Sequence, residues 1–266
     1  MSDFKYCQPV CNSASCGACC GMYNWTGHNR QMVLELLSMQ TEYYLNSSRD
    51  ELDLVRLKKE ISKKRPAARY QKIYNCEFLG FIDRDKKRVG CLLHPELNGG
   101  VNLRGISHHG RETCDQAKCT AYSYLREQEA ELVAKAADDW YLYGLCLTDL
   151  DLINEFLNIA SEMVFTEVKA VKIMADPRLL GIFSGYLSLK ESWPFARDPN
   201  RFGKYFFKDN DYPVYKIDYQ SLDSLPCRFD RIFNSLGSEF KSQDELVAGR
   251  ETLRKIFNDF VGAWRA

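Results

Sequence analysis

Five cysteines crowd the first twenty residues of this chain, and they constrain its fold more strongly than any other feature. Small residues such as Ser15 and Gly17 stand between them, so the backbone can wrap closely around a metal. Two thiolates separated by two residues can reach one ion through a tight turn. A second group of cysteines follows downstream. The two groups are Cys7, Cys11, Cys16, Cys19 and Cys20, and then Cys76, Cys91, Cys114 and Cys119.

The composition is that of an ordinary globular protein. With 266 residues, 45% hydrophobic and 27% charged, the chain can bury a substantial core without help from disulfides. Lysine plus arginine and aspartate plus glutamate both total 36, so the formal net charge is zero. No overall field attracts nucleic acid or anionic lipid. We therefore expect neither a nucleic-acid partner nor a membrane partner, and no protein partner can be identified.

The eleven cysteines are interpreted together with the expected compartment. The start of the sequence, Met1 to Lys5, lacks a basic segment followed by an apolar one, and no apolar run approaches the roughly 18 residues of a membrane helix. We expect a cytoplasmic protein. In that reducing environment cysteines stay thiols unless a metal holds them. In a secreted chain, an odd number of cysteines would leave one without a disulfide partner. Metal or cluster ligation is favoured over a disulfide framework.

Two helices are expected between the cysteine groups. The first starts at Thr26 or Asn29 and runs to about residue 45. The second opens with a capping box formed by Ser48 and Glu51 and ends at Pro66. These helices should pack as a hairpin, which would bring the two cysteine groups back together in space.

Residues 69–101 show short apolar runs around Ile73, 78–82 and 89–93, which predict a small sheet or hairpin. Cys76 precedes one strand and Cys91 lies in the next, so both can face the amino-terminal loop from one rim. The sequence beyond residue 120 is mostly helical. The predicted fold is α+β, mainly α, with a small cysteine-rich metal-binding β region packed on a helical body, in domains 1–120 and 121–266.

Within the helical part, capping patterns predict helix starts at Thr148 with Asp151, at Asp176 before Pro177, and at Ser242 with Glu245. The aromatic and proline-containing stretch 193–226 predicts an ordered, irregular connection that can carry function. Within it, residues 201–208 alternate basic and aromatic side chains as single-strand binders do, although packed aromatics fit the neutral charge better.

The cysteine spacing fits more than one metal site. Cys11, Cys16 and Cys19 have the spacing of three ligands in plant-type ferredoxins, with Cys20 or Cys76 as the fourth. Alternatively, Cys16 and Cys19 form a zinc knuckle that a pair such as Cys114 and Cys119 completes. Spacing alone does not choose between an iron-sulfur cluster and zinc.

The motif from Ser15 to Gly21 resembles the signature of the YkgJ-type cysteine-cluster family, a zinc- or iron-chelating domain. The later family pattern resembles Cys76-Glu77-Phe78-Leu79 and Gly90-Cys91-Leu92-Leu93-His94-Pro95 here. The resemblance covers about the first 120 residues. It implies eight metal-binding cysteines: Cys11, Cys16, Cys19, Cys20, Cys76, Cys91, Cys114 and Cys119.

The chain departs from the family pattern at two places. Cys11 stands further from Cys16 than the family spacing, so Cys7 or Cys11 fills the first position. The usual segment before the seventh cysteine is replaced by residues 110–113 ahead of Cys114. The family includes flagellin lysine N-methylase, and this relation implies an iron-sulfur-dependent transferase as an alternative to simple metal chelation.

Other polar residues near the cysteines have both a structural and a functional interpretation. His94, three residues after Cys91, is a turn residue or a nitrogen ligand, and His108 and His109 are surface residues or proton carriers. The predicted function is a cytosolic protein that chelates zinc or iron, the iron either as an ion or in a 4Fe-4S iron-sulfur cluster. The alternative is an iron-sulfur-dependent transferase or redox enzyme.

Overall fold

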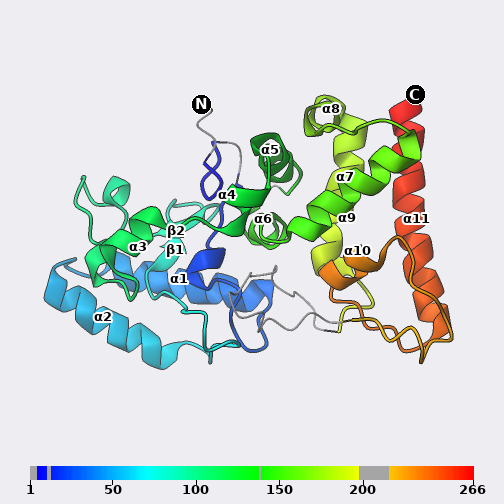
Figure 1. Cartoon of the computed structure of the whole chain (residues 1–266). Helices are drawn as coiled ribbons and strands as arrows, with labels where there is room; N and C mark the ends of the chain where they lie inside the picture. The colour runs from blue at the N-terminus through cyan, green and yellow to red at the C-terminus, as the bar shows by residue number, and fades with distance from the viewer. Residues whose placement is uncertain (1–4, 11–12, 138, 198–215) are drawn as a thin grey trace. The chain divides into compact units, whose positions relative to one another are not determined.

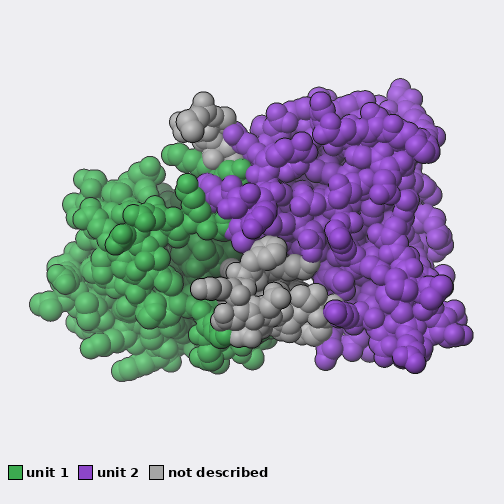
Figure 2. Space-filling model, viewed as in Figure 1, with its two compact units in different colours: residues 1–119, 139–144 green, residues 120–138, 145–266 purple. Residues whose placement is uncertain are grey.

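The computed structural model describes residues 5–10, 13–137, 139–197 and 216–266. The chain forms two compact units, which Figure 2 distinguishes by colour. The first comprises residues 1–119 with 139–144, and the second comprises 120–138 with 145–266. The described residues are mainly helical and contain one two-stranded sheet. This confirms the α+β, mainly α, class.

The first unit is built on two helices, α1 (Arg30–Leu45) and α2 (Glu51–Lys64), which contact each other as the predicted hairpin (Figure 1). The Asn29 side chain caps α1 by accepting a hydrogen bond from the Met32 amide at 2.9 Å. The predicted capping box at Ser48 is wrong. Asp50 stands directly before α2, and its carboxylate accepts from the Asp53 amide at 2.9 Å, so the serine lies too early to cap.

A two-stranded antiparallel hairpin lies against α1. Strand β1 (Leu79–Phe81) pairs with β2 (Val89–Cys91), with Leu79 opposite Cys91. The apolar residues around Ile73 form no strand in the described structure. The hairpin and both helices share one core, which includes three of the cysteines because they pack as small apolar side chains. Its members include Leu54, Leu57, Ile61, Cys76, Phe78 and Leu92, with Cys20 and Cys91 packed against them.

Short elements complete the first unit. They are η1 (Ala18–Cys20), η2 (Pro95–Leu97), η3 (Arg104–Ile106), α3 (Gly110–Gln116) and the first part of α6 (Trp140–Leu147), as far as Gly144. The helix α6 brings a distant stretch of sequence into this unit. The hydroxyl of Tyr143 donates to the Tyr6 carbonyl at 2.7 Å, and that of Tyr23 donates to the Tyr141 carbonyl at 2.8 Å.

The second unit is helical. It contains α4 (Thr120–Tyr124), α5 (Glu127–Ala136), α7 (Leu150–Val164), α8 (Ala170–Ala175), α9 (Pro177–Ser192), α10 (Asp230–Ser235) and α11 (Gln243–Arg265). The long helix α11 contacts both α7 and α9 (Figure 1). Phe156, Phe183 and Phe257 are fully buried in its core.

Helix starts in this unit follow the predicted caps in two cases of three. Asp176 caps α9 ahead of Pro177, and Ser242 caps α11 by accepting from the Glu245 amide. The cap predicted at Thr148 is wrong, because the Asp149 carboxylate accepts from the Leu152 amide instead. The basic and aromatic residues 201–208 lie outside the described residues. Across the part of the chain that is described, no helix is both long and apolar enough to cross a membrane.

Candidate metal centre

The amino-terminal cysteine loop is attached to strand β2. The Cys16 amide donates to the Cys7 carbonyl at 2.9 Å, which closes the loop on itself. Ser15 Oγ accepts from the Val89 amide at 2.8 Å, and Gln8 Nε2 donates to the Val89 carbonyl at 2.6 Å. The loop thus satisfies both backbone groups of a residue on the open edge of the hairpin. Since β2 ends at Cys91, this contact holds the first cysteine group beside the second.

A close backbone approach joins Cys20 to Cys76. The Cys76 amide donates to the Cys20 carbonyl at 2.9 Å. Gly21, which follows in the left-handed region at φ +80°, makes the approach possible. A Cβ atom at this position would lie 2.5 Å from the Tyr74 carbonyl oxygen and 2.7 Å from Asn75 Cα. Both neighbours are backbone atoms, so they cannot rotate away, and only glycine fits here.

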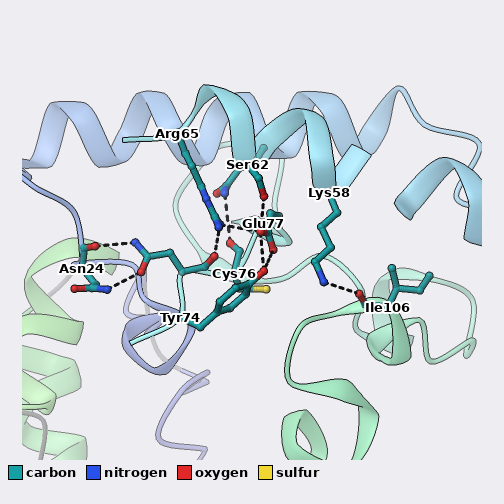
Figure 3. Close-up of polar contacts among 10 residues, drawn as sticks. Asn24, Lys58, Ser62, Arg65, Tyr74, Cys76, Glu77 and Ile106 are labelled. Atoms are coloured by element: carbon teal, nitrogen blue, oxygen red, sulfur yellow. Dashed lines mark hydrogen bonds and ion pairs between the residues drawn. The ribbon is translucent and has the colours of Figure 1, made fainter. Parts of the chain in front are cut away.

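A buried pair of asparagines, Asn24 (labelled in Figure 3) and Asn75, locks the same two segments together. Asn24 Nδ2 donates to Asn75 Oδ1, and Asn75 Nδ2 donates to the Asn24 carbonyl, each at 2.7 Å. Asn24 also donates to the Ile73 carbonyl at 2.8 Å and accepts from the Tyr70 amide at 2.9 Å. These bonds satisfy buried amide groups that would otherwise be costly, and they fix the chain just after Cys20 against the chain just before Cys76.

Glu77, directly after Cys76, is a buried carboxylate with three donors, and Figure 3 shows them converging from α2 and the preceding loop. Ser62 Oγ donates at 2.8 Å, the Tyr74 hydroxyl donates at 2.7 Å, and the Arg65 guanidinium pairs at 3.0 Å. Burial raises the pKa of Tyr74, and the hydrogen bond and charge of the Glu77 carboxylate also raise it. Because charge and hydrogen bonds are both satisfied, Glu77 ties the start of the hairpin to α2.

The remaining two cysteines of the second group are held at the end of the first unit. Cys114 lies in α3, and its Sγ is 3.2 Å from Ser107 Oγ, which precedes the helix. The helix is also tied to η3 by an ion pair between Arg104 and Asp115. Cys119 is the last residue of the first stretch of this unit. Its charge is close enough to Cys16 to affect that thiol.

The thiols act on one another electrostatically across the two sequence groups. The pKa of Cys76 is raised to about 12 and that of Cys91 to about 11, with burial as the largest cause; the charge of Cys114 contributes to both, and that of Cys91 contributes to Cys76. The pKa of Cys20 is raised by its hydrogen bond to Cys19, by burial, and then by the charges of Cys19, Cys76 and Cys91. The same hydrogen bond lowers the pKa of Cys19. Burying several thiols together thus favours their neutral form.

Cys16 shows the same behaviour in the amino-terminal loop. Its pKa is raised by burial first, and then by the charges of Cys7, Cys19 and Cys119. Cysteines of the first and second groups therefore lie within electrostatic reach of each other.

Of the eight predicted ligands, Cys11 falls outside the described residues, so the choice between Cys7 and Cys11 stays a prediction. None of the ten described cysteines forms a disulfide.

The donor set suits a soft or borderline cation in its chemistry, since thiolates are the ligands that zinc and iron-sulfur clusters use. Among the described residues, however, no group of three or more His, Cys, Asp or Glu side chains is arranged to hold a metal ion. Each cysteine has a single side-chain torsion, so a change between staggered rotamers re-aims its sulfur without moving the backbone. The cysteines therefore suit zinc or an iron-sulfur cluster in their chemistry and in the segments that carry them, whereas the described side chains are not arranged in a coordination geometry.

The nearby histidines take structural contacts. His94 caps η2, with its Nδ1 accepting from the Glu96 amide at 3.3 Å, and His108 stacks on Tyr74 with ring centroids 3.9 Å apart. His94 also lines a pocket of about 160 Å³ that reaches Cys91, together with Lys5, Gln8, Ile82, Gly90, Glu96 and Leu97. The pocket gives a small molecule access to one of the candidate ligands.

Sequence reasoning missed the residues that hold the cysteine segments together. Asn24, Asn75 and Glu77 stand in no spacing that marks them as partners, because their contacts link positions far apart in the chain. Gly21 did carry a signal, since a glycine directly after adjacent cysteines suggests a close backbone approach. No protein-family model, curated protein or solved structure matches this chain.

Proposed function

We propose that the first unit binds zinc or iron, the iron either as an ion or in an iron-sulfur cluster, through cysteines of both sequence groups. The observation that carries this proposal is the hydrogen bond at 2.9 Å from the Cys76 amide to the Cys20 carbonyl, which joins the two groups directly. A reducing compartment such as the cytoplasm belongs to the proposal, because thiols remain available to metal there. The ligands are drawn from Cys11, Cys16, Cys19, Cys20, Cys76, Cys91, Cys114 and Cys119, with Cys7 as the other candidate for the first position.

The electrostatics of the thiols support a cation as their partner. Burial raises the pKa of Cys16, Cys76 and Cys91, and the hydrogen bond to Cys19 followed by burial raises that of Cys20; the charges of neighbouring thiols raise all four, so as thiolates they would repel. A metal or cluster supplies positive charge that stabilises adjacent thiolates, and its binding releases their protons. Binding should therefore tighten as pH rises toward neutrality and should contribute to folding of the first unit.

Elemental analysis of anaerobically purified protein, with an absorption spectrum and an acid-labile sulfide assay, tests the proposal. Brown protein with iron and sulfide identifies a cluster, and colourless protein with stoichiometric zinc identifies a zinc site. Protein that carries neither metal, and takes up neither on reconstitution under reducing conditions, contradicts the proposal.

A stability measurement provides a second test. Chelation should lower the melting temperature of the wild-type protein, because metal binding free energy is part of the folding free energy. The double variant Cys16→Ser, Cys19→Ser should melt lower and should lose its response to chelator. The single variant Cys146→Ser, in the second unit, is the matched control and should keep the chelator response. An identical chelator response in all three proteins would refute the role of these cysteines.

The pocket beside Cys91 favours a second candidate, an iron-sulfur-dependent transferase or redox enzyme. An enzyme of this kind needs a centre that a small molecule can reach, and the pocket of about 160 Å³ opens on Cys91 next to Lys5 and His94. Filling the pocket from its exposed rim with Leu97→Trp should leave the metal content unchanged while blocking access of a small redox reagent to the centre. Equal accessibility in wild type and variant would remove the observation on which this candidate depends.

A further inference from the structure

A separate pocket of about 300 Å³ lies within the second unit, and its wall carries three arginines and no acidic side chain. Arg250, Arg254 and Phe257 face it from one stripe of α11, at the spacing that puts residues on one side of a helix. Arg228 and Phe229 approach it from the segment before α10. The volume is at the lower end of the range for small-molecule pockets, roughly 300 to 1,000 Å³.

Within the described ranges, two of the arginines are held by exposed ion pairs alone. Arg228 pairs with Glu162 at 2.9 Å, and Arg254 pairs with Glu251, with every side chain about half exposed or more. Such pairs are weak in water, so a stronger anion can replace either carboxylate. The two acids are therefore exchangeable partners and leave the guanidinium groups available to a ligand.

Arg250 is the third arginine, and among the described residues it forms no ion pair with a carboxylate. Its guanidinium donates to the Leu225 carbonyl and hydrogen-bonds with the Cys227 thiol, while its buried Nε has no acceptor in the described structure. The nearby Asp230 is engaged elsewhere, accepting from the Tyr219 hydroxyl and from the Cys227 amide. The guanidinium of Arg250 therefore lacks a carboxylate partner among the described residues, and an anion in the pocket would supply the missing counter-charge.

Phe229 and Met163 give the pocket an apolar part beside the arginines, and the buried Phe257 supports Phe229 from the core. The rings of Phe229 and Phe257 are both buried and stack at 11° with centroids 5.7 Å apart. Planar guanidinium groups bind phosphate oxygens in pairs, and several arginines together match the charge and tetrahedral shape of a phosphate better than those of a carboxylate. We propose that this pocket binds a small phosphate monoester whose apolar part lies against Phe229 and Met163. The proposal is independent of the metal centre.

Titration calorimetry of the full chain with phenyl phosphate tests the site, at an ionic strength of about 0.15 M so that diffuse charge attraction is screened. We expect saturable binding with a Kd of about 1 mM or tighter. Arg250→Gln should weaken it by about tenfold, the size of a lost hydrogen bond to a charged group. The matched control is Arg231→Gln, since Arg231 is an arginine of the same unit that pairs with Glu155 at 2.7 Å and does not line the pocket.

The other arms identify the ligand and control for folding. Inorganic phosphate should bind more weakly than phenyl phosphate, and benzoate should bind more weakly still. Arg250→Lys, which keeps the charge but removes the fork, covers the case in which the glutamine variant does not fold, and it should also weaken binding. No saturation up to about 10 mM, equal loss in Arg231→Gln, or unchanged affinity in both Arg250 variants would overturn the site. Benzoate binding as tight as that of phenyl phosphate would overturn the phosphate assignment.

Discussion

Replacing Gly21 with alanine tests whether a close backbone approach holds the two cysteine groups together. The position has φ +80°, and a Cβ there would meet backbone atoms of Tyr74 and Asn75 within 2.7 Å. Gly27 provides a matched control, because it has a similar φ of +67° but a Cβ at this position would meet nothing within 4 Å. The two variants share the backbone strain and differ only in the steric contact.

The expected effects follow from these two terms. A left-handed alanine costs about 1 to 2 kcal/mol, of which the stiffer unfolded chain offsets about 0.4 to 1, so Gly27→Ala should lower the free energy of unfolding by about 1 kcal/mol. Gly21→Ala adds an overpacking cost of about 1 to 3 kcal/mol, since backbone neighbours cannot rotate away. The total for Gly21→Ala is therefore about 2 to 4 kcal/mol.

Urea unfolding followed by circular dichroism measures both variants, and metal analysis of the purified proteins gives a second readout. Gly21→Ala should also reduce the metal content, whereas Gly27→Ala should retain it. If the two variants lose the same stability within about 0.5 kcal/mol, the close approach contributes nothing beyond φ strain. If both keep the wild-type metal content, Gly21 does not position the cysteines.

Three further predictions concern buried polar groups. Glu77→Gln should lower the free energy of unfolding by about 3 kcal/mol, the lower end of the cost of breaking a buried ion pair, because its partner Arg65 is 17% exposed. A loss of only a few tenths of a kcal/mol in urea unfolding would contradict this prediction. In metal-free protein the pKa of Cys91, raised to about 11, keeps this thiol neutral near pH 8, so iodoacetamide should label the exposed Cys19 first and Cys91 only as pH rises. Because folded Cys91 holds its proton more tightly than the unfolded thiol, the stability of the protein should fall above pH 9. Equal labelling of the two cysteines, measured by mass spectrometry, would refute the burial argument. Lys190→Met should destabilise the second unit by about 3 to 5 kcal/mol in thermal or urea unfolding, because it leaves Asp149, 2.6 Å away and buried, without its cation, and adding Asp149→Leu should recover part of that loss.

The sequence predicted the local features of the fold well, because they depend on neighbouring residues. The second predicted helix forms as α2 and ends before Pro66, and helix starts at Asn29, Asp176 and Ser242 follow their capping side chains. The errors at Ser48 and Thr148 have one cause. In each case an aspartate closer to the helix provides the cap, and a pattern of residue types does not rank two candidate caps that stand one or two positions apart.

Some features of the candidate site can be read from the sequence, and others depend on the tertiary structure. The number, spacing and residue type of the cysteines are properties of the sequence, and they suffice to suggest metal chemistry. The contacts that bring Cys20 to Cys76 depend on Asn24, Asn75 and Gly21, whose partners lie about fifty positions away. Only the folded chain pairs them, because a buried amide is satisfied by whichever group the packing brings within hydrogen-bond distance, and that choice is not encoded by local spacing.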